Sequence, residues 1–126
     1  MNDRTLDRGV RPPTEMELTD PYHAYEYARD VLRAPFPAGE GAIAKDPYSA
    51  FFYALNVLRA PFPAGEAAIA KKADWAYEYA RDVLRAPFPA GEAAIATDPW
   101  WLEMYKAFVR RWKENHEEFM KDLDSP

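Results

Sequence analysis

Apolar residues recur three and four positions apart early in the chain, and a proline then interrupts the pattern. After Asp20 and Pro21, the residues that share one stripe of a helix are Ala24, Tyr27, Ala28, Val31 and Leu32. An Asp before a Pro is a side-chain N-cap followed by a proline at the first helical position. Because Pro35 disfavours helical geometry at Ala34, we expect this helix to run to about Arg33.

A second, shorter helix is predicted after the turn. Pro37 restarts the helix, and the next Asp-Pro pair begins at Asp46, so the segment PAGEGAIAK forms only about two turns. Isolated helices this short are marginal in water. The two helices therefore form a hairpin that needs neighbours to be stable.

The hairpin recurs along the chain with a period of 26 residues. The copies read DPYHAYEYARDVLRAPFPAGEGAIAK, DPYSAFFYALNVLRAPFPAGEAAIAK and KADWAYEYARDVLRAPFPAGEAAIAT. These repeats 1, 2 and 3 occupy residues 20–45, 46–71 and 72–97, after a polar segment 1–19 that is either flexible or packed as an N-terminal cap. A fixed period of this size is typical of a solenoid, in which each unit buries its apolar face against the next. We therefore predict an all-α fold, a short α-solenoid of three 26-residue helical hairpins.

A degenerate fourth copy, residues 98–126, opens with Asp-Pro but lacks the turn. It reads VRRWKENHEE where the repeats have VLRAPFPAGE, so a helix can run from Pro99 to about Leu123. The apolar stripe of this helix comprises Trp101, Met104, Tyr105, Phe108, Trp112, Phe119 and Leu123. A long helix with a polar outer face is typical of a solenoid end, so we expect a C-terminal capping helix. A membrane-binding amphipathic helix is the alternative, but the polar face is mixed in sign and not basic.

The junction before repeat 3 lacks the Asp-Pro pair. Lys72 and Ala73 replace it, and the sequence AAIAKKADWAYEYA has high helix propensity throughout. Either Asp74 takes over as the N-cap two residues late, or the short helix of repeat 2 continues into the long helix of repeat 3. We favour the late cap, because a continuous helix would swing the next unit out of the stack.

Repeat 2 carries apolar residues where its neighbours are charged. At positions that hold Glu, Arg and Asp in repeats 1 and 3, repeat 2 has Phe52, Leu55 and Asn56. Phe52 and Leu55 are three apart and share one helix face. This patch is a candidate for partner binding or self-association. The alternative is that it is tolerated in solvent or covered by the chain's own ends, either Met16 and Leu18 or the long last helix.

Ser49, the one serine inside the repeats, is the fourth residue of the candidate surface. His23 and Trp75 hold the same repeat position and are weaker candidates, as is Arg59. Arg59 belongs to a row with one arginine per unit: Arg33, Arg59, Arg85 and Arg111. Some repeat proteins read RNA with such a row, but a cation at a helix C-terminus also meets free carbonyls favourably. We expect the structural role.

A row of tyrosines lies on the predicted inner stripe, at Tyr27, Tyr53, Tyr79 and Tyr105. A buried tyrosine needs a hydrogen-bond partner for its hydroxyl. The candidates for this partner, again one per repeat, are Glu40, Glu66 and Glu92. We expect these tyrosines to belong to the core and not to a site.

Composition narrows the function classes. The 126 residues include no cysteine and only two histidines, so we expect no metal, no cofactor and no catalytic residues. The net charge of −5 is spread evenly, which leaves no basic face for a nucleic acid. The charged N-terminus lacks the apolar centre of a signal peptide, and no stretch approaches a membrane span. We expect a cytoplasmic, non-enzymatic protein.

The unit DPYxAxxYAxxVLRAPFPAGExxIAK resembles short tandem repeats of bacteriophage and bacterial proteins. Their units combine YA, a valine or isoleucine, a Gly-Arg-Phe/Trp-Pro stretch, then Glu and Ile. The match covers residues 20–97, about three fifths of the chain, which departs from the pattern with Arg-Ala-Pro before Phe36, Phe62 and Phe88. The resemblance implies a phage or mobile-element origin, hence a host cytoplasm, and no established activity.

These observations favour a function through protein–protein contact. The resemblance implies a phage-type inhibitor or adaptor, since small phage proteins without enzymatic sites often block host machinery, including defence complexes. A self-associating structural repeat protein is the competing class, and an RNA-binding repeat protein comes third. Partner identity lies beyond the sequence.

Overall fold

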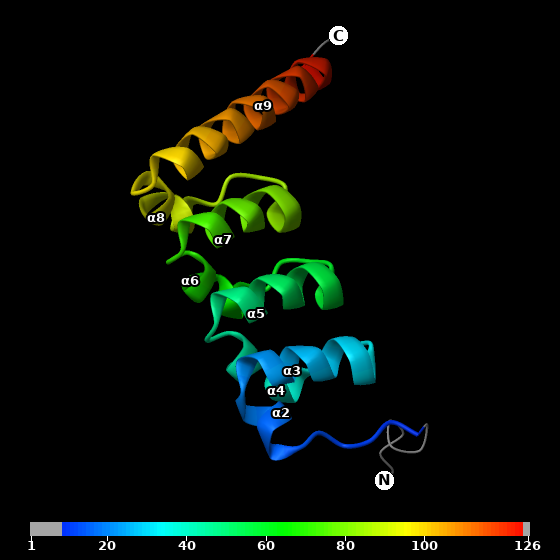
Figure 1. The fold of residues 1–126 in the computed structure, drawn as a ribbon. Coiled ribbons are helices and arrows are strands. Elements are labelled where there is room, and N and C mark those ends of the chain that lie inside the picture. Colours follow the sequence, from blue (N-terminus) through cyan, green and yellow to red (C-terminus); the bar gives the residue numbers. More distant parts are fainter. Residues whose placement is uncertain (1–8, 125–126) are drawn as a thin grey trace. The chain divides into compact units, whose positions relative to one another are not determined.

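The computed structural model describes residues 9–124, and every regular element in this range is a helix (Figure 1). The all-α prediction is confirmed. The chain divides after Ile69 into two compact units. The first contains α2 (Glu15–Thr19), α3 (Pro21–Glu26), η1 (Tyr27–Leu32), α4 (Pro37–Ile43), α5 (Pro47–Phe52), η2 (Tyr53–Leu58), η3 (Pro63–Gly65) and α6 (Glu66–Ile69). The second contains α7 (Ala73–Glu78), η4 (Tyr79–Leu84), η5 (Pro89–Gly91), α8 (Glu92–Ala96) and α9 (Pro99–Asp124).

Each repeat has a long arm and a short arm, as the hairpin pattern predicts. The long arms are α3 with η1, α5 with η2 and α7 with η4; the short arms are α4, η3 with α6, and η5 with α8. In the first unit, α3 packs against α4 and α5. The continuous solenoid over all three repeats stays a prediction. Among residues 9–124, no helix combines the length and apolar character needed to cross a membrane.

The long arm of repeat 1 begins as predicted, and its second half is not an α-helix. The Asp20 carboxylate accepts a hydrogen bond from the N–H of His23 at 3.0 Å, and Pro21 is the first helical residue. The second half of the arm is a π-helix, because the Ala28 carbonyl accepts the N–H groups of Arg33 and of the residue after it. This wider closure puts Arg33 in the left-handed region at φ 53° and ends the helix at Leu32, one residue earlier than predicted.

The short arms depend on a glycine that lies against the long arm. A Cβ atom added at Gly65 would lie 2.7 Å from the Cβ of Ala50 and 2.7 Å from the Phe62 ring, both well inside van der Waals contact. Gly91 meets Ala76 at the same 2.7 Å. The PAGE motif therefore lets two helix backbones approach where any side chain would separate them.

Both expectations for the junction before repeat 3 were wrong. α6 ends at Ile69 and α7 begins at Ala73, so the helix is not continuous. The N-cap is Lys72, with extended backbone and no capping side chain, and Asp74 lies inside the first turn. The long arm of repeat 3 thus starts at the same repeat position as the others although its capping residue is missing.

Two tyrosine hydroxyls each connect a helix to the short arm that precedes it. The predicted hydrogen bond between a tyrosine of the inner stripe and a glutamate of the PAGE motif is present in both cases. Tyr53 donates to Glu40 at 2.6 Å and accepts the Phe36 N–H at 2.8 Å. Phe36 is the N-cap of α4 and has no side-chain hydrogen bond of its own, so Tyr53 satisfies a helix-end donor. Tyr105 of α9 donates to Glu92 at 2.6 Å and accepts a backbone N–H in the same way.

We expect the stability of the chain to fall as the pH rises above about 10. Burial, and then the hydrogen bond to Glu92, raises the pKa of Tyr105 from 10.0 to about 12, and the same causes raise the pKa of Tyr53. Their stabilisation is fully present below the unfolded value and is lost as the pH rises from about 10 towards about 12. Urea unfolding should show little change from about pH 9 to about pH 10, and then a decline that approaches about 1.4 kcal/mol per pH unit for each tyrosine towards about pH 11. A Tyr53→Phe, Tyr105→Phe variant should lose most of this decline, and an unchanged slope would contradict the assignment.

The N-terminal segment forms α2 on repeat 1. A capping box joins Thr14 and Glu17, and Arg11 pairs with Glu17 at 2.6 Å. α2 packs on α3 and α4, and the hydroxyl of Tyr27 donates to the Arg11 carbonyl. Residues 1–8 of the polar segment lie outside the described part of the chain.

The long helix expected from Pro99 is present as α9 and packs on repeat 3. The Trp101 ring lies 5.6 Å from the Tyr77 ring, and Phe108 lies 6.5 Å from it. Tyr105 is buried and Met104 is 38% exposed, at the edge of the predicted stripe. The side chains of Phe119 and Leu123, at its far end, lie outside the described residues.

Candidate protein-binding surface

Phe52 is half-buried against aromatic residues of its own unit. Its ring centroid lies 4.8 Å from Tyr48, 5.0 Å from Phe51 and 6.5 Å from Tyr25 of repeat 1. Met16 and Leu18, one proposed cover, are themselves 55% and 37% exposed. Tyr25 therefore covers part of the Phe52 ring, and cover by the chain's own ends stays a prediction.

Asn56 also contacts repeat 1. Its amide donates to the Tyr25 hydroxyl at 2.9 Å. In repeat 1, Arg29 lies over the Tyr25 ring at 5.1 Å and pairs with Asp30 at 2.7 Å. An aspartate like Asp30 cannot donate a hydrogen bond, whereas an asparagine can. The differences in repeat 2 are thus explained in part by packing against repeat 1, and Leu55 is half-buried at the Arg29 position.

The other sequence candidates have different surroundings. Ser49 is fully buried, so its assignment to a contact surface was wrong. Its small side chain fits the inner side of the helix, where its hydroxyl has no hydrogen-bond partner among residues 9–124. His23 is exposed, with its Nδ1 atom 2.7 Å from the Asp20 carboxylate. Trp75 is half-buried.

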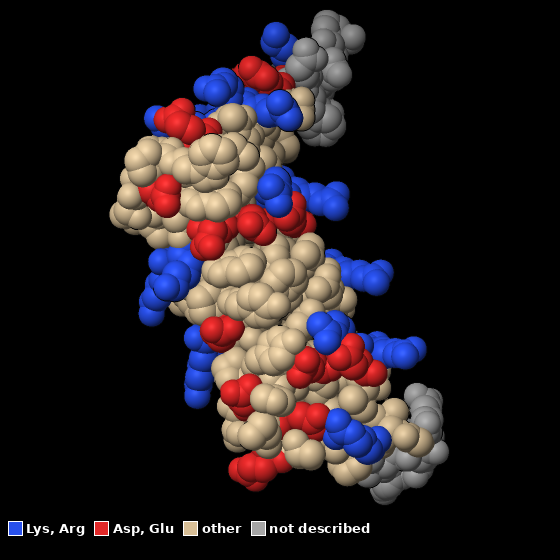
Figure 2. All heavy atoms as spheres, in the orientation of Figure 1, with Lys and Arg blue, Asp and Glu red and all other residues tan. Residues whose placement is uncertain are grey.

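The arginine row occupies strained backbone positions. Arg33, Arg59 and Arg85 have φ values of 53°, 52° and 54°, a conformation that costs an L-residue about 1 kcal/mol relative to glycine. Their side chains are exposed and make no ion pair with any residue from 9 to 124. They lie at the C-terminal ends of the π-helices, where carbonyls face a cation favourably. In Figure 2 both charge signs alternate over the face in view.

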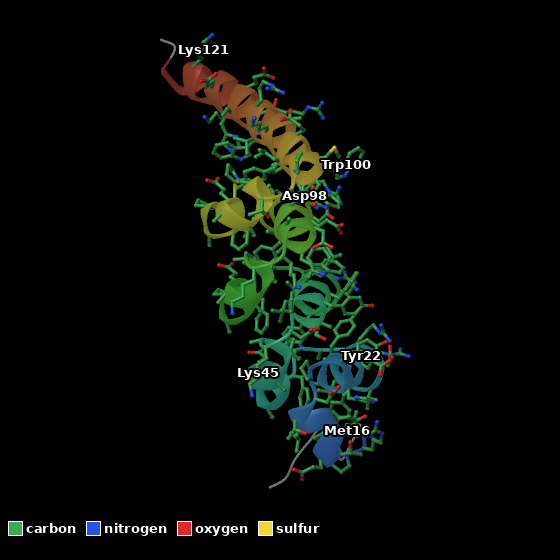
Figure 3. All side chains as sticks on the ribbon, turned by 60° about the vertical axis from the view of Figure 1, so that its left-hand side comes forward. Met16, Tyr22, Lys45, Asp98, Trp100 and Lys121 are labelled. Atoms are coloured by element: carbon green, nitrogen blue, oxygen red, sulfur yellow. The ribbon has the colours of Figure 1, made fainter. Side chains whose placement is uncertain are left out.

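The most exposed aromatic pair was missed by the sequence analysis. Tyr22 and Tyr48 are 40% and 43% exposed, and their rings lie 6.1 Å apart. Each follows an Asp-Pro pair in the first turn of a long arm, and Tyr22 is labelled in Figure 3. Trp100, 67% exposed, holds the same position in the fourth copy. An aromatic residue after Asp-Pro in three of the four copies was the signal that could have identified this position.

We call Tyr22, Tyr48 and Phe52 the tyrosine face. All three residues belong to the first unit, on α3 and α5. A carboxylate lies beside this face, since a hydrogen bond to Glu26 is the main cause that raises the pKa of the Tyr22 hydroxyl, and Glu26 also pairs with Arg29 at 3.8 Å. Such a face can bury aromatic surface against a protein, and the carboxylate disfavours a phosphate backbone.

No site for a metal ion is formed by the described residues, among which no three His, Cys, Asp or Glu side chains gather. The chain matches no protein-family model, no curated protein sequence and no solved structure.

Proposed function

We propose that this chain is a non-enzymatic protein–protein interaction module, an inhibitor or adaptor of phage type, that binds a partner protein through the tyrosine face. The observation that carries this proposal is the pair of exposed, neighbouring rings of Tyr22 and Tyr48, 6.1 Å apart. Tyrosine supplies a large contact area with few rotatable bonds, so little entropy is lost on binding. The half-buried Phe52 continues the same apolar surface.

Two competing functions are less well supported. Exposed tyrosines can also stack on the bases of single-stranded RNA, but such sites combine stacking with a positively charged groove. Here the Tyr22 hydroxyl is hydrogen-bonded to Glu26, and the nearby cation, Arg29, is itself paired with Glu26 at 3.8 Å and Asp30 at 2.7 Å. Self-association through the same face is the second competitor, and it predicts that Tyr48→Asp alone abolishes any rise in the mass of the pure protein with concentration.

The chain itself offers the test substitution. Asp74 holds the position of Tyr22 and Tyr48 in repeat 3, inside the first turn of α7. Tyr22→Asp with Tyr48→Asp therefore copies a residue that the scaffold already accommodates, and an acidic residue in the first turn suits the helix dipole. We expect the melting temperature to change by less than about 3 °C.

Partner capture should respond very differently. Tagged wild-type and doubly substituted chains are used to capture proteins from a host lysate, and the captured proteins are compared by mass spectrometry. We expect proteins retained by the wild type to be lost from the variant. Retention of the same proteins at the same level by both chains would refute a role for the tyrosine face. Trp100→Asp, the matched change in the second unit, is the control and should retain the partner.

A further inference from the structure

A groove of about 530 Å³ runs along α9 within the second unit. α8 contributes Glu92 to its lining, and α9 contributes apolar Leu102 and Val109 together with three cations, Lys106, Arg110 and Lys113. Of these cations, Lys106 lies 3.4 Å from Glu103. Arg110 and Lys113 form no ion pair with any described residue. The groove therefore joins an apolar floor to a basic rim.

The groove lies where a short arm packs against the long arm in the other repeats. By repeat register, Leu102 and Lys106 match Ala24 and Ala28. Ala24 is fully buried and would lie 3.2 Å from a Cβ atom added at Gly39 of the short arm. In the fourth copy the helix continues through the position of the turn, so none of residues 99–124 folds back as a short arm. The surface that a short arm covers in repeat 1 is left open beside α9.

α2 is a short arm without a preceding long arm among the described residues. It precedes α3 as α4 precedes α5, and it packs on α3 and α4. It carries Glu15 and Glu17 in its first turn and no basic residue in its last turn; Glu17 is paired with Arg11 at 2.6 Å, so Glu15 is the acidic residue that is left for the groove. Its apolar residues Met16 and Leu18 are 55% and 37% exposed. Its charge and its exposed apolar atoms complement the basic rim and apolar floor of the groove.

We propose that the groove beside α9 binds α2 of a second copy of this chain, so that copies associate head to tail. The fourth long arm then gains its missing short arm from the next molecule. Continuation of the repeat register also brings Tyr22 of the incoming copy towards Trp100, as Tyr48 lies beside Tyr22 within one chain. Such a contact is heterologous, because each molecule uses two different surfaces.

The strength of this contact is limited by one unfavourable pairing. In the register that places Phe52 beside Tyr25, Glu26 of the incoming copy would approach Glu103 of α9. Like charges at an interface oppose association. We therefore expect association of the pure chain only at concentrations on the order of 0.1 mM and above.

Sedimentation or light scattering of the full chain tests the proposal. The weight-average mass of the wild type should rise with concentration above the mass of one chain. Arg110→Glu with Lys113→Glu alters only the groove, and Glu15→Lys alters only α2; each variant should remain monomeric. Arg111→Glu reverses the same kind of charge on the same helix outside the groove, and it should associate like the wild type. A wild type that stays monomeric at millimolar concentration would overturn the proposal.

Mixing the variants gives a result that only a head-to-tail contact produces. The groove variant keeps an intact α2, and the Glu15→Lys variant keeps an intact groove, so their mixture should form dimers and nothing larger. Failure of the mixture to form dimers, or association by either variant alone, would contradict the contact. These variants leave the tyrosine face unchanged, so failure here and failure of partner capture are distinguishable.

Discussion

Gly39→Ala is expected to destabilise the protein, whereas Gly41→Ala, two residues further along α4, is expected to stabilise it. A Cβ atom at Gly39 would overlap the Phe36 ring and lie 3.2 Å from the Cβ of Ala24. Phe36 is buried, with its ring 4.9 Å from that of Tyr27, so it has little room to move aside. Overpacking of this kind costs about 1–3 kcal/mol.

Gly41 is the matched control within the same helix. No atom lies within 4 Å of a Cβ atom added there, so only the gain in helix propensity remains, about 0.5–1 kcal/mol. Urea unfolding of the two variants should therefore move the midpoint in opposite directions. A shift of both in the same direction would show that the close approach at Gly39 does not govern the packing of the short arm.

Sequence periodicity predicted the helices well because their signals are local. Asp20 and Pro21 fix the start of the first long arm by a side-chain hydrogen bond and a restricted φ angle, which neighbouring residues suffice to show. The π-helical second half carries no such local signal. In it, the Ala28 carbonyl accepts hydrogen bonds from the fifth and sixth residues along the chain.

The junction before repeat 3 shows tertiary packing overriding a local signal. Asp74 is the better capping residue by type, yet Lys72 holds the N-cap position. The Ala76 N–H donates to the Lys72 carbonyl at 2.8 Å, and a start two residues later would give up this bond beside the buried Ala76 and Tyr77. Burial of that face outweighs the loss of one capping bond of about 1 kcal/mol.

The candidate surface was predicted only in part, because the sequence analysis compared residues at the same position in different repeats and not residues that are neighbours in space. Phe52 was compared with its counterparts in the other repeats, whereas its packing depends on Tyr25, a residue at a different repeat position. Spatial neighbours of this kind follow from the stacking of helices and not from the alignment of copies. The exposure of Tyr22 and Tyr48 follows from their place in the first helical turn, and this place could be read from the Asp-Pro pair before each of them.

Removal of residues 98–126 is expected to unfold or aggregate the second unit. Trp101 and Phe108 cover Tyr77, and Tyr105 supplies the hydroxyl that Glu92 and the Phe88 N–H require. Loss of three large aromatic side chains exposes apolar surface worth several kcal/mol, at roughly 25 cal/mol per Å². It also leaves a helix-end donor without its partner, which costs about 1–3 kcal/mol. For a unit of this size such a loss is comparable with its whole stability.

A shorter truncation is the matched control, because Trp101, Tyr105 and Phe108, which supply the contacts with repeat 3 given above, lie in the first half of α9. Removal of residues 118–126 leaves Trp101, Tyr105, Phe108 and Trp112 in place, so this chain should remain soluble and lose only the helical signal of the deleted residues. Circular dichroism should show that the longer deletion loses more helix than its missing residues account for, because α7 and α8 no longer pack. A soluble, monomeric chain ending at Thr97 with full helical content in repeat 3 would contradict the capping role of α9, since its exposed apolar face would then need no cover.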